Sequence, residues 1–328
     1  MLKPFGFSKS GMLSFAVWTT VVFCGAFPAA AQDYPTKAIT MVTSSPAGGG
    51  GDVLTRYLAT KLRDVLGVPV VVENKPGGAG NIGVHTVTRA KPDGYTVLVS
   101  ASSSVIANKF VVKETNFDAM KDLSPVSTFL QVGLALVVPP DRKATNVTEL
   151  VAELKALKRP MFYGVPTTSA LFGSEMFLRL TGLQGTRVNY KGMGEAASGI
   201  NAGELDFAFI DTTLAISQAR QGRLKVLAVS PKTRLQSEPN LPTIRESGIA
   251  FDYINFWAVW APGGTPDAVT AKLSDAINKV VATPDVQDFF LKQGAEALPG
   301  SPAKLAEMSK SHNDLWVEIA KAAKLEPQ

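Results

Sequence analysis

The sequence predicts an α/β protein made of two lobes, and three observations support this. Short apolar strands alternate with amphipathic helices, the alternation starts again in the middle of the chain, and 328 residues exceed what one simple core usually holds. Strand–helix–strand alternation is typical of parallel sheets with right-handed crossovers.

The first part of the chain supplies the clearest elements. The helix expected at 53–66 has an apolar face made by leucines four residues apart, namely Leu54, Leu58, Leu62 and Leu66. A second helix is expected at 83–90. Apolar runs predict strands at 38–42, 70–72 and 95–100.

The middle of the chain repeats this order, and the C-terminal part is helical. Helices are expected from about 171 to 180 and at 194–202, with strands at 161–163, 187–190, 206–210 and 224–229. A hydroxyl residue followed by proline is a strong signal for a helix start. It occurs at Thr265-Pro266, Thr283-Pro284 and Ser301-Pro302. We therefore expect 32–131 and 255–328 to form one lobe, onto which these helices pack, and 132–254 to form the other.

The N-terminal residues have the layout of a secretory signal peptide. Lys3 and Lys9 precede an apolar stretch, and a small-residue site ends at Ala31. Cleavage near Ala31 would leave 297 residues and lower the net charge from +5 to +3, because only these two charged residues are removed. We expect a periplasmic protein; an uncleaved anchor, or a lipid on Cys24, is the alternative.

The composition excludes several classes of function. Cys24 is the only cysteine, so the mature chain has no disulfide and no cysteine metal site. No run of lysine or arginine predicts nucleic-acid binding. His85 and His312 stand in no metal-binding or nucleophile motif, and both are expected to be structural or on the surface. We expect no enzyme activity, no metal and no cofactor.

A glycine-rich loop after the first strand is the main candidate for a binding site. It contains Ser44, Ser45, Ala47, Gly48 and Gly49, and a helix follows it directly. Glycines allow close approach of the backbone, and a helix N-terminus favours an anion. Asp52 is expected as the N-cap, although its charge would partly oppose an anion. A merely flexible turn is the alternative.

Neither glycine motif fits a nucleotide. Asp52-Val53 stands where a P-loop needs lysine and a hydroxyl residue. The segment Gly78 to Gly83 matches G-x-G-x-x-G, but five residues separate it from the preceding strand. No acidic residue for a ribose follows the next strand, so dinucleotide binding is not expected.

Polar residues also follow other strands, where ligands bind in open α/β sheets. From the first lobe these are Ser102 and Ser103. The second lobe contributes Thr167, Thr168, Ser169, Tyr190 and Asp211. Two lobes facing each other would hold a small polar anion. No arginine occurs in these loops, so amides, hydroxyls and water are expected to recognise the ligand.

Several motifs give the chain a specific resemblance. They are SPAGGGGD (45–52), VENKPGGAGNIG (72–83), PDGYT (92–96), KDLSPV (121–126), YKG (190–192), GELDF (203–207), LPTIRESG (241–248) and APGGTP (261–266). With them the chain resembles the substrate-binding proteins of tripartite tricarboxylate transporters, the Bug or TctC-type receptors.

The resemblance implies a type II periplasmic-binding-protein fold with a ligand cleft between two α/β lobes. It implies that the protein holds a small organic acid by a carboxylate at the first glycine-rich loop and delivers it to a membrane permease. We expect a monomer. One departure concerns the loop after Tyr163, which is about two residues shorter than is usual in this family and lacks a histidine. The ligand therefore stays open.

Two other functions remain as alternatives. The chain could be a sensor that presents its ligand to a signalling partner. It could also be a hydrolase or isomerase that uses Asp211 or Asp52.

Overall fold

The structure is a computed structural model that describes residues 34–113 and 115–327. The expected signal peptide, its cleavage site at Ala31 and Cys24 lie outside the described residues. Both sheets belong to one unit that begins at Pro35.

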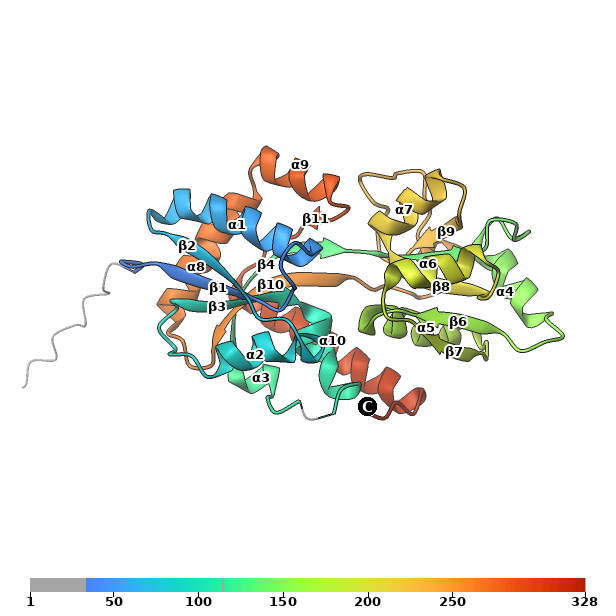
Figure 1. Cartoon of the computed structure of the whole chain (residues 1–328), viewed down its shortest axis with the longest axis horizontal. Coiled ribbons are helices and arrows are strands. Elements are labelled where there is room, and N and C mark those ends of the chain that lie inside the picture. Colours follow the sequence, from blue (N-terminus) through green and yellow to red (C-terminus); the bar gives the residue numbers. More distant parts are fainter. Residues whose placement is uncertain (1–33, 114, 328) are drawn as a thin grey trace, which may run out of the picture. The chain divides into compact units, whose positions relative to one another are not determined.

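The first sheet has the strand order β11-β4-β10-β3-β1-β2 (Figure 1). Its strands β1, β2 and β3 are parallel, and β10 pairs antiparallel with β3 and β4. The bounds are β1 Ile39–Thr43, β2 Val70–Asn74, β3 Thr96–Ala101, β4 Leu123–Val132, β10 Asn255–Pro262 and β11 Glu296–Ala297.

The second sheet has the order β7-β6-β8-β5-β9. Its strand β6 is parallel to β7 and β8, and β5 is antiparallel to β8 and β9. The bounds are β5 Leu134–Val138, β6 Phe162–Val165, β7 Thr186–Asn189, β8 Phe207–Asp211 and β9 Lys225–Val229. The predicted fold class, two α/β lobes, is confirmed.

Helices cover both sheets. The first lobe contains α1 Gly50–Leu66, α2 Asn81–Thr88, α3 Ala119–Asp122, α8 Asp267–Val281, α9 Pro284–Lys292 and α10 Pro302–Ala322. The second contains α4 Val147–Lys155, α5 Thr168–Thr181, α6 Met193–Asn201 and α7 Thr212–Arg220. Short helical turns are η1 Gly78–Gly80, η2 Ser103–Ala107, η3 Asn108–Phe110 and η4 Ile244–Ser247. None of the described helices is long and apolar enough to cross a membrane.

Alternation along the strands explains the core of the second lobe. Leu134 and Leu136 of β5 pack with Phe207 and Phe209 of β8 on one face. The intervening residues, such as Val137 and Ile210, belong to a separate cluster on the other face. Because both faces of the sheet are buried, the sequence of β5 is apolar at every position.

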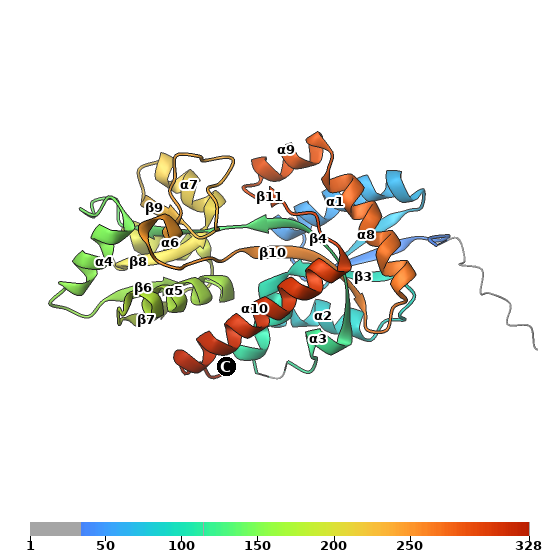
Figure 2. The ribbon, with the colours of Figure 1, turned by 180° about the vertical axis from the view of Figure 1, so that it is seen from behind.

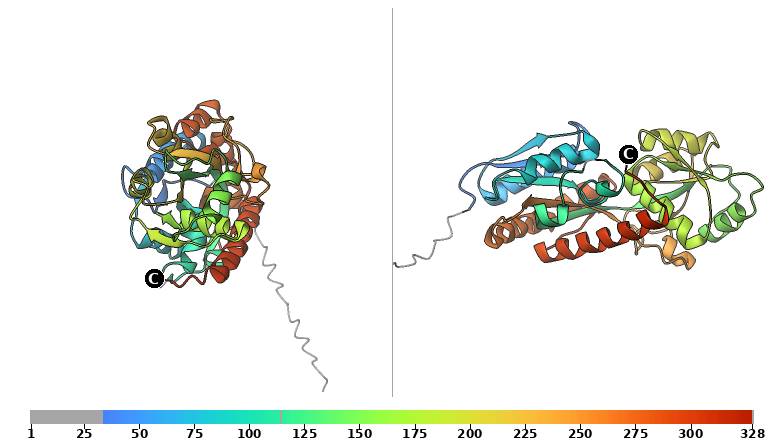
Figure 3. Two further views of the ribbon diagram at one scale, coloured as in Figure 1. Left: turned by 90° about the vertical axis from the view of Figure 1, so that its right-hand side faces the viewer. Right: turned by 90° about the horizontal axis from the view of Figure 1, so that it is seen from below.

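The chain passes between the lobes at two adjacent places (Figures 1 and 3). It enters the second sheet at Gly133 and returns in the segment between β9 and β10. Ser230 joins the two crossings, because its hydroxyl accepts a hydrogen bond from the Leu134 N–H and donates one to the Tyr253 carbonyl. Helix α10 contacts both β4 and α5, so it lies against both lobes (Figure 2).

Two expected helix caps are wrong by a few residues. Helix α1 begins at Gly50 with Gly49 as its N-cap, so Asp52 lies inside the first turn. Helix α8 begins after Pro266, and the Thr265 hydroxyl instead donates to the Pro262 carbonyl. Thr283 and Ser301 are N-caps as predicted, and the Ser301 hydroxyl accepts the Lys304 N–H.

Candidate functional site

The N-terminus of α1 presents free backbone donors. Within residues 34–113 and 115–327, the amide N–H groups of Gly50 and Gly51 have no hydrogen-bond partner. The N-cap Gly49 has no side chain to fill this space. The loop therefore offers donors and the positive end of a helix dipole to an anion.

Asp52 holds this loop in place by hydrogen bonds and does not cap the helix. Its buried carboxylate accepts hydrogen bonds from the Gly48 N–H, the Asn74 amide and the Arg56 guanidinium. Burial by itself would raise the pKa of Asp52, but these hydrogen bonds outweigh it and lower the pKa to about 2. Because Arg56 balances the charge, the expected conflict between Asp52 and an anion is reduced.

Trp257 of β10 closes one side of the loop. A Cβ on Gly51 would clash with the Trp257 indole and with the Ser45 hydroxyl. The Asn74 amide donates to the Ser45 carbonyl, which fixes the other side. Gly51 is therefore needed for close packing, and the half-buried Trp257 belongs to the wall of the candidate site.

Serines cluster at the carboxyl ends of β1 and β3. The hydroxyls of Ser44 and Ser100 are 2.7 Å apart and hydrogen-bonded. The Asn255 side-chain carbonyl accepts from the Ser102 hydroxyl and the Ser103 N–H. The structure thus places Ser44, Ser102 and Ser103 on neighbouring strand ends of the first lobe.

The second glycine motif packs against this cluster. A Cβ on Gly80 would lie 3.3 Å from the Ser44 Cβ, and one on Gly83 would lie 3.1 Å from the Ser44 Cα. Asn108, which is buried, donates to the Ala79 carbonyl and to Asn81 and so holds the motif in place. Close packing explains these glycines without a nucleotide.

The second lobe contributes the N-terminus of α5. Thr167 is its N-cap, and the Thr167 hydroxyl accepts the Ala170 N–H and lies 3.0 Å from the Ser169 hydroxyl. Ser169 is buried. In the described part of the chain the Thr168 hydroxyl has no hydrogen-bond partner, so it is available to a ligand.

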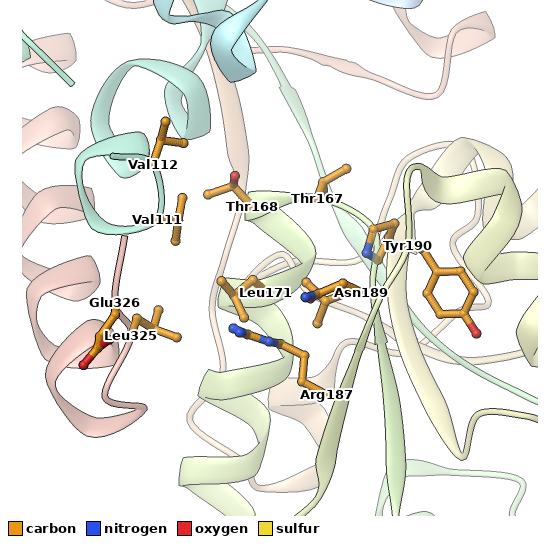
Figure 4. Close-up of a pocket in the computed structure, with 12 residues that line it drawn as sticks. Val111, Val112, Thr167, Thr168, Leu171, Arg187, Asn189, Tyr190, Leu325 and Glu326 are labelled. Carbon is orange, nitrogen blue, oxygen red and sulfur yellow. The ribbon is translucent and has the colours of Figure 1, made fainter. Parts of the chain in front are cut away.

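A cavity of about 270 Å³ lies beside this helix N-terminus (Figure 4). Thr167, Thr168 and Tyr190 of the predicted set line it. Ser44, Ser45, Ala47, Gly48, Gly49, Ser102 and Ser103 are not among its lining residues. The other residues that line it are Val111, Val112, Val165, Pro166, Leu171, Arg187, Asn189, Leu325 and Glu326.

Arg187 changes the expected chemistry of this cavity. It comes from β7, and its guanidinium points toward Leu171 and Leu325 (Figure 4). The expectation that amides, hydroxyls and water recognise the ligand considered the loops alone, whereas Arg187 belongs to a strand.

The Tyr190 ring lies away from the cavity (Figure 4). It packs beside Gly164 and Gly199, and its hydroxyl donates to Glu204 at 3.5 Å. Its backbone N–H donates to the Val165 carbonyl at 3.1 Å. The structure does not bring this ring together with Thr167 and Thr168.

Asp211 ends β8, on the sheet face that carries Phe207 and Phe209. Burial raises its pKa to about 6, and no described residue forms a hydrogen bond with its carboxyl group. Burial and the nearby Asp211 charge also raise the pKa of Tyr253, whose hydroxyl has no partner in the described chain. Asp211 therefore lies near the crossing between the lobes, beside Tyr253.

The two histidines have structural surroundings. His85 meets Phe117 edge-on, and His312 lies between Tyr253 and Phe256. Burial lowers the pKa of His312 to about 4, so it is neutral at pH 7. Among the described residues no group of histidine, cysteine and carboxylate side chains could hold a metal ion.

Comparison with known proteins identifies the family. Residues 54–325 match the model of the tripartite tricarboxylate transporter family receptor. A UPF0065 protein of Bordetella bronchiseptica is 32% identical over 306 residues, which cover 92% of this chain and 90% of that protein. The protein BugT of Bordetella pertussis is 31% identical over 300 residues, which cover 90% of this chain and 92% of that protein.

Two solved structures have the same fold over nearly the whole chain. The periplasmic binding protein BugD is 29% identical, with a TM-score of 0.73, and covers 90% of this chain and 100% of its own. Rpa4515 of R. palustris, solved with adipate, is 27% identical, with a TM-score of 0.77 and the same coverage. From its sequence and its fold, the chain belongs to the receptor family of the tripartite tricarboxylate transporters, whose members are solute-binding proteins.

Proposed function

We propose that this protein captures a small carboxylate-bearing solute between its lobes and delivers it to a membrane permease. The free N–H groups of Gly50 and Gly51 at the N-terminus of α1 carry the proposal. They begin α1 directly after a loop that is held by Asp52 and lies against Trp257, so they are oriented before a ligand arrives. A carboxylate is one of the small anions that such donors bind.

The proposed contacts with the solute come from both lobes. Ser44, Ser45, Ala47, Gly48, Gly49, Ser102 and Ser103 would surround the carboxylate from the first lobe. Thr167, Thr168 and Ser169 would contact the body of the solute from the second, with Asp211 near the crossing. The related Rpa4515, whose structure contains adipate, supports a small organic acid as the ligand.

A thermal-shift screen followed by calorimetry tests the proposal. Small mono-, di- and tricarboxylates should raise the melting temperature, and the tightest should bind with a stoichiometry of one. The recovered ligand should be chemically unchanged, as NMR before and after incubation would show. A screen in which only sugars or cations stabilise the protein contradicts the proposal, and turnover would favour an enzyme.

Delivery requires export and a permease. We propose that the protein works in the periplasm as a monomer after cleavage near Ala31. The exported protein should then begin at Gln32 by N-terminal sequencing and run as a monomer in light scattering. Deleting its gene should abolish uptake of the solute, and a loss of signalling with intact uptake would favour the sensor alternative.

A further inference from the structure

We infer that Arg187 selects solutes that carry a second acidic group, and this inference rests on the proposed function. The inference is based on the position of Arg187, which is half-buried and lines the cavity at the boundary between the lobes. Within residues 34–113 and 115–327 its guanidinium forms no ion pair and no hydrogen bond. An arginine carries five N–H donors, and removing them partly from water without acceptors is costly.

The nearby acidic side chains do not satisfy this arginine. The Glu175 carboxylate accepts the Tyr163 hydroxyl at 2.6 Å. Glu326 is exposed, and its carboxylate points away from the guanidinium (Figure 4). Both carboxylates share a neighbouring hollow with Arg187, but in the described part of the chain neither forms an ion pair with it, so its guanidinium is available to an anion.

The rest of the cavity suits a short carbon chain that ends in a carboxylate. Val111, Val112 and Leu171 supply apolar surface, and the free Thr168 hydroxyl lies at the start of α5. An arginine fork binds a planar carboxylate with two parallel hydrogen bonds, which a hydroxyl or an amide cannot match. The α1 loop does not line this cavity, so the proposal requires a solute that extends from the loop to the cavity, and such a solute gains the contact with Arg187 only if it carries a second carboxylate.

Matched pairs of acids that differ only in the second carboxylate test this inference. Calorimetry would compare hexanedioate with hexanoate, and likewise each dicarboxylate from four to eight carbons with its monocarboxylate. We expect the wild type to bind the best dicarboxylate roughly 10- to 100-fold more tightly than its partner acid, which is the range for charged hydrogen bonds. Arg187→Gln should remove this preference, and Arg187→Lys should keep part of it.

Arg223→Gln is the matched control, because Arg223 is an exposed arginine of the same lobe that does not line the cavity. It should retain the wild-type preference, and the melting temperatures of all variants should be compared without ligand. If the preference survives in Arg187→Gln, or if the wild type binds both acids equally, the inference is wrong while the proposed function stands. If no carboxylate binds the wild type, the proposed function and the inference fail together.

Discussion

The Asp211 carboxyl group makes a measurable link between pH and stability. Burial raises its pKa from 3.8 to about 6, so the folded state holds this proton over a pH range in which the unfolded state releases it. The stability that the proton provides is complete below about pH 4 and is lost as the pH rises through 6. The ionised Asp211 therefore costs the folded protein on the order of 1–3 kcal/mol at neutral pH.

Asp211→Asn should accordingly stabilise the ligand-free protein at pH 8 by on the order of 1–3 kcal/mol and leave it nearly unchanged at pH 4. Urea unfolding at both pH values measures the difference. Asp288→Asn serves as the control, because Asp288 is exposed on α9. An equal effect of Asp211→Asn at both pH values would show that burial of its charge is not the cause.

Asp52 has the opposite dependence on pH. Its pKa is lowered to about 2, so its contribution to stability is present above about pH 4 and is lost as the pH falls through 2. Asp52→Asn should reduce the free energy of unfolding at pH 7 by on the order of 1 kcal/mol, because charged hydrogen bonds to Gly48, Arg56 and Asn74 are weakened. Thermal unfolding followed by circular dichroism at pH 7 and pH 2.5 would measure the difference in stability between the wild type and Asp52→Asn. A difference that is as large at pH 2.5 as at pH 7 would contradict the prediction.

At the start of α1, two adjacent glycines allow a sharp test of the anion loop. A Cβ on Gly50 would meet no atom within 4 Å, whereas one on Gly51 would clash with Trp257 and Ser45. Gly51→Ala should therefore displace these side chains and weaken carboxylate binding at least tenfold, while Gly50→Ala should bind nearly as the wild type does. Calorimetry with the best acid of the screen compares them, and equal affinities of the two variants would place the carboxylate elsewhere.

Local patterns predicted the elements whose signal lies within a few residues. The leucine repeat of α1 and the apolar runs of β1, β3 and β8 coincide with the observed elements within one to three residues. Strand β4 was not predicted, because buried Ser127 and Thr128 interrupt its apolar pattern. Their surroundings are provided by distant residues, such as the Gly300 carbonyl that accepts the Ser127 hydroxyl.

The residues of the candidate site also fall into two groups, those with a local sequence signal and those placed by distant segments. Residues of the glycine-rich loop and the start of α5 follow strands directly, so the sequence indicates them. Trp257 and Arg187 lie within strands, and only the packing of distant segments brings them to the loop and to the cavity. Tyr190 shows the reverse, because it follows β7 as expected but its ring packs on Gly199 of α6.

Across the whole molecule, the lobes also meet away from the two chain crossings. The Thr213 hydroxyl donates to the Gln293 carbonyl at 2.9 Å, and the Gln236 N–H donates to Glu296 at 2.8 Å. Each of these bonds joins a residue of the second lobe to one of the first. These two bonds are exposed, whereas the buried contact between the lobes is made by α10, whose Trp316 packs on Phe172 of α5. A ligand that contacts both lobes would shift the balance between open and closed forms if the lobes turn about this buried contact.

If the protein delivers its solute to a permease, as proposed, its loaded form must present a different surface to that partner. Moving the protein from mostly open to mostly closed requires a ligand that favours the closed form by about 5 kcal/mol. A few buried or charged hydrogen bonds at roughly 1–3 kcal/mol each would be enough.

Saturating ligand should therefore reduce the radius of gyration of the protein in small-angle scattering. Thr168→Ala should weaken both the binding of the ligand and this compaction, because it removes a contact from the second lobe only. Thr186→Ala, an exposed threonine on β7, should change neither. If saturating ligand leaves the radius of gyration of the wild type unchanged, either closure does not accompany binding or the free protein is already closed, and a ligand-free scattering curve that fits an open form would decide for the former.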